Sequence, residues 1–241
     1  MEIVEALKNV LENIRSSAVK ADRDPDIIKL IAVSKTVELQ LIIEAVNAGA
    51  AILGENRVQE AKSKIEEFRS LTPPAPPLAK GGIIGGVEWH LIGNLQKNKA
   101  RTAVELFDLI HSVDSADLAA ELNKHAKNAG KVQDVLVQVK LSDEATKHGA
   151  LEKDIRDLLG SVMEMDNLNL RGLMTIPPFF DDPEKARPFF RKLRQIAETS
   201  SAKGFPVNEL SMGMSNDYEV AIEEGATMVR VGTAIFGARN F

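Results

Sequence analysis

Short apolar runs alternate with amphipathic helical patterns along the chain, and this alternation constrains the fold more than any other feature. The first run, at residues 27–33, is rich in β-branched side chains, as buried strands are. Seven further strands are predicted near residues 50–53, 88–92, 106–111, 134–140, 168–174, 209–212 and 227–231. After an amphipathic N-terminal helix, helical patterns lie near residues 37–47, 55–68, 96–104, 115–128, 151–163, 183–202 and 215–224.

Regular strand–helix alternation is typical of a parallel sheet, in which each strand leads into a crossover helix. Eight such units in 241 residues match the size of a (β/α)8 barrel of the TIM type, and we expect one α/β barrel domain over residues 1–241. A doubly wound sheet is the alternative. No G-x-G-x-x-G motif follows the first strand, which argues against a dinucleotide-binding version of that fold.

One segment interrupts the alternation. Residues 71–86 read LTPPAPPLAKGGIIGG and hold four of the ten prolines and four of the sixteen glycines. Such a stretch cannot build a regular element, so we expect a loop inserted between the second helix of the alternation and the third strand. A partner-binding polyproline tract is the less favoured interpretation.

Composition excludes several classes of function. Thirty basic and thirty-five acidic residues give a net charge of −5 without a basic block, so nucleic-acid binding is not expected. The chain has no cysteine, which excludes disulfides, thiolate nucleophiles and cysteine-based metal sites. His111, His125 and His148 show no metal-ligand spacing, and we expect no metal.

The N-terminus gives no sign of targeting. It reads MEIVEALKNVLENIRSS, with acids where a signal peptide would carry positive charge. The most apolar stretch, residues 39–53, is broken by Gln40, Glu44 and Asn47, so we expect no membrane span. With the absence of cysteine, this predicts a cytoplasmic protein.

Functional groups of a parallel barrel gather at the carboxyl ends of its strands. After the seventh strand, Met212 to Ser215 form a small-residue turn that we expect to open a helix, capped by Ser215 or Asn216. Free amides at this helix start, together with those of Gly232 and Thr233 after the last strand, would bind an anion such as phosphate. Plain helix capping is the alternative, and an acid at Asp217 favours it.

Lys35 is the second candidate, because it lies at the end of the first strand. Burial would favour a neutral, nucleophilic amine that can form a Schiff base with an aldehyde; a solvent-exposed lysine is the alternative. A lysine beside a phosphate site suggests pyridoxal phosphate (PLP), or a Schiff-base aldolase. Arg230 shares a strand face with Met228 and Gly232, so it points toward this space if that face is inward; a buried ion pair is its alternative role.

Five segments, most of which contain these residues, carry a resemblance to a known family. They are IAVSK at 31–35, GENRVQEAKSK at 54–64, WHLIGNLQKNK at 89–99, RGLMTI at 171–176 and LSMGMSNDYEVAIEEGATMVRVGTAIFG at 210–237. Together they resemble the pyridoxal phosphate homeostasis protein family. The resemblance implies a single fold-type III barrel of the alanine racemase N-terminal type, PLP on Lys35, and no established catalytic turnover.

The resemblance assigns roles to individual residues. Lys35 matches the Schiff-base lysine, Asn56 an asparagine near the cofactor ring, and Arg230 an arginine facing the pyridine nitrogen. The positions implied for the phosphate cradle are Met214, Ser215, Gly232 and Thr233. Met212 and His90 match positions that line the pocket.

Two functions compete. The favoured one is a monomeric, non-catalytic carrier that buffers PLP, delivers it to apo-enzymes, and so maintains vitamin B6 and amino-acid homeostasis. The other is an amino-acid racemase, which needs an acid–base group on each face of the substrate carbanion. Tyr218 is the only tyrosine, and we expect no second domain after Phe241 to supply another. An interaction protein that uses PLP as a regulatory ligand is a third possibility.

Overall fold

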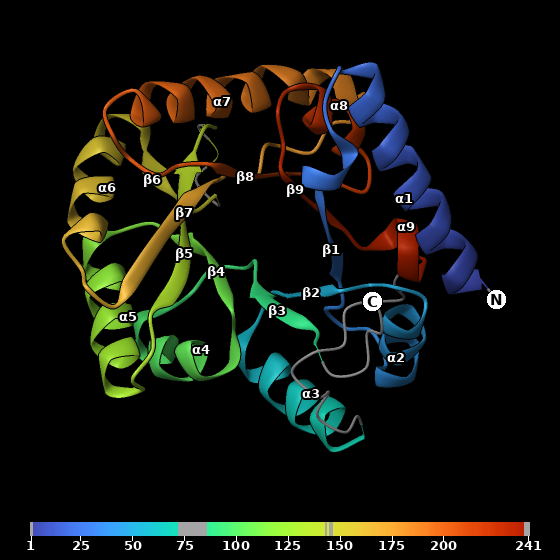
Figure 1. Cartoon of the computed structure of the whole chain (residues 1–241), viewed down its shortest axis with the longest axis horizontal. Coiled ribbons are helices and arrows are strands. Elements are labelled where there is room, and N and C mark those ends of the chain that lie inside the picture. Colours follow the sequence, from blue (N-terminus) through green and yellow to red (C-terminus); the bar gives the residue numbers. More distant parts are fainter. Residues whose placement is uncertain (1, 72–85, 143, 145–146, 239–241) are drawn as a thin grey trace.

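The structure, a computed structural model, describes residues 2–71, 86–142, 144 and 147–238. Figure 1 shows its helices surrounding a ring of strands. The strands of the ring are β1 (Lys29–Val33), β2 (Ile52–Glu55), β3 (Glu88–Leu91), β4 (Leu109–Val113), β5 (Gln133–Lys140), β7 (Leu168–Met174), β8 (Glu209–Met214) and β9 (Met228–Val231).

These eight strands form a closed parallel barrel. They pair in the order β4-β3-β2-β1-β9-β8-β7-β5, and a further pairing of β4 with β5 closes the ring. Closure leaves no free sheet edge within the ring, whereas a doubly wound sheet would keep two. The structure therefore confirms the predicted (β/α)8 barrel.

The helices lie outside the ring (Figure 1). In the described part of the chain the α-helices are α1 (Glu2–Lys20), α2 (Leu39–Asn47), α3 (Val58–Leu71), α4 (Ala100–Leu106), α5 (Ala116–Asn128), α6 (Ile155–Met163), α7 (Arg187–Ser201), α8 (Tyr218–Glu223) and α9 (Thr233–Phe236). Short 3-10 helices cover Pro25–Ile27, Lys97–Lys99, Glu152–Asp154 and Pro183–Ala186. Among these helices we find none with an apolar stretch long enough for a membrane crossing.

Apolar side chains form two separate layers because side chains alternate along each strand. The larger layer packs between the barrel and the helices, and includes Trp89 and Leu91 of β3. The smaller one fills the inside of the barrel with Ile31, Val33, Ile52, Ile92, Leu109, Leu136, Met174 and Met228. Helix α1 adds to the outer layer, and Figure 1 shows it beside α8 and α9. The Asn13 amide on α1 donates to the Tyr218 hydroxyl at 3.2 Å.

Element boundaries differ from the prediction in a few places. A two-residue strand, β6 (Ala150–Leu151), pairs with β5 outside the ring and was not predicted. Strand β2 starts and ends two residues later than predicted, because Gly54 and Glu55 pair with β3 and do not open the next helix. Of the predicted insertion at 71–86, Leu71 ends α3, Gly86 precedes β3, and residues 72–85 lie outside the described residues.

Candidate functional site

The segments that follow the carboxyl ends of several strands enclose a cavity of about 500 Å³. Its walls come from the ends of β1, β2, β3, β7, β8 and β9, where a barrel carries its functional groups. Seven of the nine residues predicted for the site line it: Lys35, Asn56, Met214, Ser215, Arg230, Gly232 and Thr233.

Lys35 lies two residues beyond β1 and is half-buried in the cavity wall. A buried ion pair holds the backbone beside it. The Lys64 ammonium group donates to the Ser34 carbonyl oxygen at 2.7 Å and to Glu55 Oε1 at 2.7 Å, and that oxygen also accepts from the Ser34 hydroxyl at 2.6 Å. Burial raises the pKa of Glu55, while Lys64 opposes this shift. The pair therefore fixes the start of the loop that carries Lys35.

The residue after Lys35 is held in an unusual conformation. Thr36 has a φ of 58°, in the left-handed region that β-branched residues rarely adopt. Its amide donates to Glu60 Oε1 at 2.5 Å, and Lys64 contacts the same oxygen at 3.1 Å. Such strain persists only where surrounding contacts impose it. The loop is thus bound on both sides of Lys35 by side chains of β2 and α3.

Asn56 reaches the cavity because two loops pack closely together. A Cβ atom on Gly93, which follows β3, would lie 2.3 Å from the Asn56 carbonyl oxygen, so only glycine permits this approach. The contact joins the loop after β2 to the loop after β3. It brings Asn94 into the same cavity wall as Asn56.

An irregularity at the end of β8 turns Met214 into the cavity. The register of β8 against β9 shifts between Ser211 and Met214. Gly213, inside this shift, has a φ of 92°, and a Cβ atom there would lie 2.6 Å from the Ala221 side chain. The turn that follows is closed by Asp217, whose Oδ1 accepts from the Met214 amide at 2.6 Å.

The predicted helix cap at Ser215 or Asn216 is wrong. Helix α8 begins only at Tyr218, with Asp217 at its N-cap position, because the turn closed by Asp217 delays the helix. The Ser215 hydroxyl instead accepts from the amide of Gly232 at 3.1 Å and from that of Ala234 at 3.5 Å. Backbone amides from the loop after β9 therefore meet a hydroxyl from the loop after β8, and the hydroxyl proton of Ser215 can be donated to an anion.

Arg230 lies on the inward face of β9 and is only 3% exposed. Its Nη1 donates to Ser211 Oγ at 2.6 Å and its Nη2 to the Thr175 carbonyl oxygen at 2.9 Å. Burial lowers the pKa of Arg230 to about 10, so the guanidinium remains charged at neutral pH. No carboxylate among the described residues forms an ion pair with it, which does not support the alternative ion-pair role.

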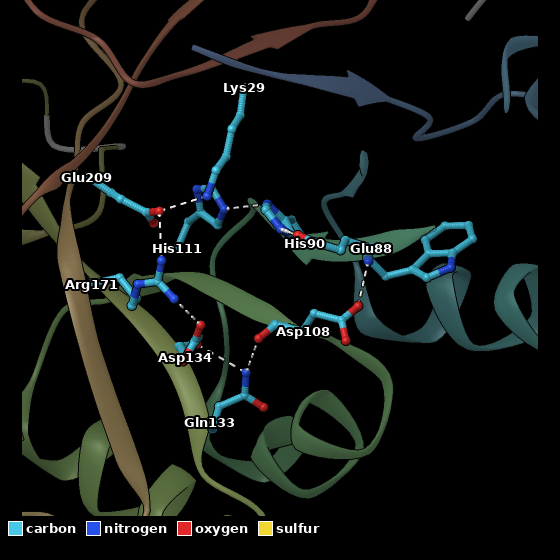
Figure 2. A network of polar contacts seen from close by, with 10 residues as sticks. Lys29, Glu88, His90, Asp108, His111, Gln133, Asp134, Arg171 and Glu209 are labelled. Carbon is cyan, nitrogen blue, oxygen red and sulfur yellow. Dashed lines mark hydrogen bonds and ion pairs between the residues drawn. The ribbon is translucent and has the colours of Figure 1, made fainter. Parts of the chain in front are cut away.

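Two predicted residues lie away from the cavity lining. Met212 follows the inward-facing Ser211, so strand alternation directs its side chain into the layer between barrel and helices. His90 shares the inward face of β3 with Ile92 but lies deeper in the barrel. Ile92 lines the carboxyl-end cavity, whereas His90 lines a second cavity at the amino end. Figure 2 shows His90 among other residues that line this second cavity.

Sequence reasoning missed other lining residues, of which Asp217 is the most informative. We assigned it to helix capping, yet its buried carboxyl group lines the cavity. Burial raises the pKa of Asp217, and the charge of Arg230 opposes the shift. Asp217 follows the carboxyl end of β8, and this position in the sequence could have marked it as a cavity residue. The remaining unpredicted lining residues are Val33, Ile92, Gly93, Asn94, Ile176, Phe179 and Asn216.

Comparisons with known proteins agree with this architecture. The family described as alanine racemase, N-terminal domain, matches residues 5–240. The pyridoxal phosphate homeostasis protein of Aquifex aeolicus is 42% identical over 242 residues, covering 100% of both chains. The structure of PipY from Synechococcus elongatus PCC7942, solved with PLP bound, is 39% identical with a TM-score of 0.82, covering 98% of this chain and 100% of that one. The crystal structure of a protein from Bifidobacterium adolescentis is 35% identical with a TM-score of 0.88, covering 98% of this chain and 94% of that one. The chain therefore belongs to the family of pyridoxal phosphate homeostasis proteins, within the larger family of alanine racemase N-terminal domains.

Proposed function

We propose that this chain binds PLP in the carboxyl-end cavity and acts as a non-catalytic carrier that buffers the cofactor and delivers it to apo-enzymes. The observation that carries the proposal is that Lys35, Arg230 and Ser215 line one cavity. PipY, a relative with 39% identity, was solved with PLP bound, and the curated relatives are named as homeostasis proteins rather than as enzymes. We also propose that residues 1–241 form one cofactor-binding domain.

The cavity fits such a ligand in size and chemistry. Small-molecule sites typically occupy about 300–1,000 Å³ with a few placed polar groups, and this cavity measures about 500 Å³. The Ser215 oxygen accepts from the amides of Gly232 and Ala234, so its hydroxyl proton is the donor that this loop offers to a phosphate group. The buried guanidinium of Arg230 offers donors to a ring nitrogen, and Lys35 supplies an amine.

Each residue then has a defined task. The Lys35 amine would add to the aldehyde carbon with loss of water, and the ion pair of Lys64 with Glu55 holds the Ser34 backbone next to Lys35. Arg230 carries only donors, so a ring nitrogen that faces it has to accept a hydrogen bond and remain unprotonated. Bound PLP supplies an aldehyde for covalent capture and an electron-withdrawing ring, and the ring withdraws electrons less strongly without its proton.

The position of Tyr218 favours a carrier over a racemase. A racemase needs a second acid–base group opposite the lysine. The hydroxyl of Tyr218, the sole tyrosine, accepts from Asn13 on α1 and does not line the cavity.

Transfer of cofactor to an apo-enzyme tests the proposal. The holo-protein is mixed with an apo form of a PLP-dependent enzyme, and the recovered enzyme activity is followed beside an equal concentration of free PLP. A trap for free PLP is present in both samples. We expect activity to recover from the holo-protein despite the trap. Recovery that the trap abolishes equally in both samples contradicts delivery and favours the regulatory-ligand alternative.

A further inference from the structure

A chain of polar side chains runs through the interior of the barrel and joins its two ends. At the amino end it opens into a second cavity of about 270 Å³, lined by Lys29, Glu88, His90, Asp134, Arg171 and Glu209 among others. Figure 2 shows this charged network around the two histidines His90 and His111. The carboxyl-end cavity begins at the other end of the chain, at Arg230.

Four hydrogen bonds link these ends without a gap. The distances are 2.6 Å from Arg230 Nη1 to Ser211 Oγ and 2.9 Å from Ser211 Oγ to His111 Nδ1. The next two hydrogen bonds measure 3.1 Å from His111 Nε2 to His90 Nδ1 and 3.3 Å from His90 Nε2 to Glu88 Oε2. Every member except Glu88 is buried, and the Glu88 side chain is 59% exposed.

The chemistry of Arg230 and Glu88, at the two ends of this series of hydrogen bonds, sets which atom donates and which accepts at each step. Arginine has only donors, so Ser211 accepts from Arg230 and keeps its own proton, which it can give to His111 Nδ1. His111 then carries its proton on Nε2 and donates to His90, which in turn donates to the carboxylate of Glu88. The opposite order would place the bare Nε2 of a neutral His90 against a carboxylate, two acceptors in contact.

The environment of the chain agrees with this direction. Burial lowers the pKa of His111 well below its usual value, and the positive charges of Arg230 and Lys29 act in the same sense, so His111 is neutral at pH 7. The hydrogen bond from His90 lowers the pKa of Glu88, which keeps its carboxylate ionised as an acceptor. A neutral imidazole has one donor and one acceptor nitrogen, as each inner position of the chain requires.

We propose that Ser211, His111 and His90 are positioning residues that orient Arg230 toward a bound cofactor ring and couple it to the amino-end cavity. The inference rests on the proposed function, because it takes the cofactor ring to lie against Arg230. Ser211 and the Thr175 carbonyl oxygen are the two acceptors that fix the guanidinium plane. The ring nitrogen therefore depends on a hydrogen-bond chain that ends on the far side of the barrel.

The donor and acceptor roles of His90 and His111 can be tested in the apo-protein, independently of any cofactor. Long-range proton–nitrogen NMR spectra of histidine-labelled protein distinguish the two neutral tautomers and the cation. We expect the Nε2 atoms of His90 and His111 to carry the protons that are donated along the series of hydrogen bonds, and both Nδ1 atoms to accept. A His111 proton on Nδ1, or a charged His111, would overturn the proposed direction.

Variants of the amino-end cavity test the coupling. Glu88→Ala removes the last acceptor at an exposed position and should shift the nitrogen resonances of both His90 and His111. Asp134→Ala is the matched control, because Asp134 lines the same cavity but binds Arg171 and Asn169 instead. Coupling is overturned if Glu88→Ala leaves His111 unchanged, or if the control shifts it equally.

The holo-protein completes the test with nitrogen-15-labelled PLP. Ser211→Ala should weaken binding by about tenfold, the effect of losing one hydrogen bond to a charged group, and should shift the ring-nitrogen signal. Ser211→Thr keeps the hydroxyl and should restore both. An unchanged ring-nitrogen signal in Ser211→Ala overturns the positioning role. Failure of the wild-type protein to bind PLP would instead overturn the proposed function, and the apo spectra would still decide the direction of the chain.

Discussion

Replacing Lys64 with methionine tests the ion pair that holds the Lys35 loop. The Lys64 ammonium group lies 2.7 Å from both Glu55 Oε1 and the Ser34 carbonyl oxygen, and the Glu55 side chain is 0% exposed. Methionine keeps the apolar stem of the lysine but leaves a buried carboxylate without its cation. Breaking a buried pair in this way typically costs about 3–5 kcal/mol of unfolding free energy.

Protonation of Glu55 limits this loss and makes it depend on pH. Neutralising an ordinary carboxyl group at pH 7 costs about 4 kcal/mol, and burial already raises the pKa of Glu55. We therefore expect the variant to lose about 3–4 kcal/mol near pH 7. As the pH falls, folded Lys64→Met binds a proton at Glu55 that the unfolded chain does not bind. The loss should shrink by up to about 1.4 kcal/mol per pH unit.

Urea unfolding of both proteins near pH 7 and near pH 5.5 measures these free energies. The double variant Lys64→Met/Glu55→Gln is the control, because it removes the buried charge together with its partner and should recover most of the loss. A loss below about 1 kcal/mol near pH 7, or an equal loss at both pH values, would refute the reasoning.

Three further predictions concern the turn after β8, the acid stability and the chemistry of the site. Gly213→Ala should lower the unfolding free energy by about 2 kcal/mol or more in urea unfolding, because alanine is strained at a φ of 92° and its Cβ would meet Ala221. Gly160→Ala is the control, because Gly160 lies in helix α6 with open space around it, and it should raise the unfolding free energy by up to about 1 kcal/mol. Equal effects of the two substitutions would contradict the role given to Gly213. Buried His111 has a pKa below that of the unfolded chain, so its contribution to stability is present above about pH 6.5 and is lost as the pH falls further. His111→Gln should therefore show a shallower fall in stability below pH 6.5 than the wild type, and parallel curves would count against this assignment. Alanine and serine should not be racemised, since Tyr218 lies outside the cavity; chiral chromatography showing turnover of about 1 s⁻¹ or more would contradict the carrier.

The barrel could be predicted because its signal is repeated along the whole chain. Each apolar run of strand length is followed by a helical pattern, and the number of units matches a closed ring. The predicted ends of strands and helices were wrong where the local sequence pattern conflicts with the pairing of strands. The sequence pattern predicts that Gly54 ends the strand and Glu55 starts a helix, yet both residues belong to β2 because they pair with β3. Strand β6 has two residues and no pattern of its own.

The site could be predicted in part, since strand ends mark the cavity but do not give the direction of each side chain. Strand ends and alternation predict that Lys35 and Arg230 face one space, and both line the carboxyl-end cavity. Met212 does not line it, and the same alternation separates it from its inward-facing neighbour Ser211. The chain through His90 and His111 depends on contacts between β3, β4 and β8, residues that are up to 100 positions apart in the sequence. No local motif encodes such contacts.

Borohydride reduction followed by peptide mass mapping tests the central claim most directly. The protein is incubated with PLP, reduced to fix any carbon–nitrogen double bond, digested, and searched for the cofactor adduct. Lys35→Ala serves as the matched control, and the reaction is repeated at PLP concentrations near and far above that of the protein. We expect one adduct near stoichiometry, on Lys35, and none in the variant. An adduct on Lys29 or Lys97, or no adduct above the level of the variant, would contradict the assignment of the cavity as the PLP site.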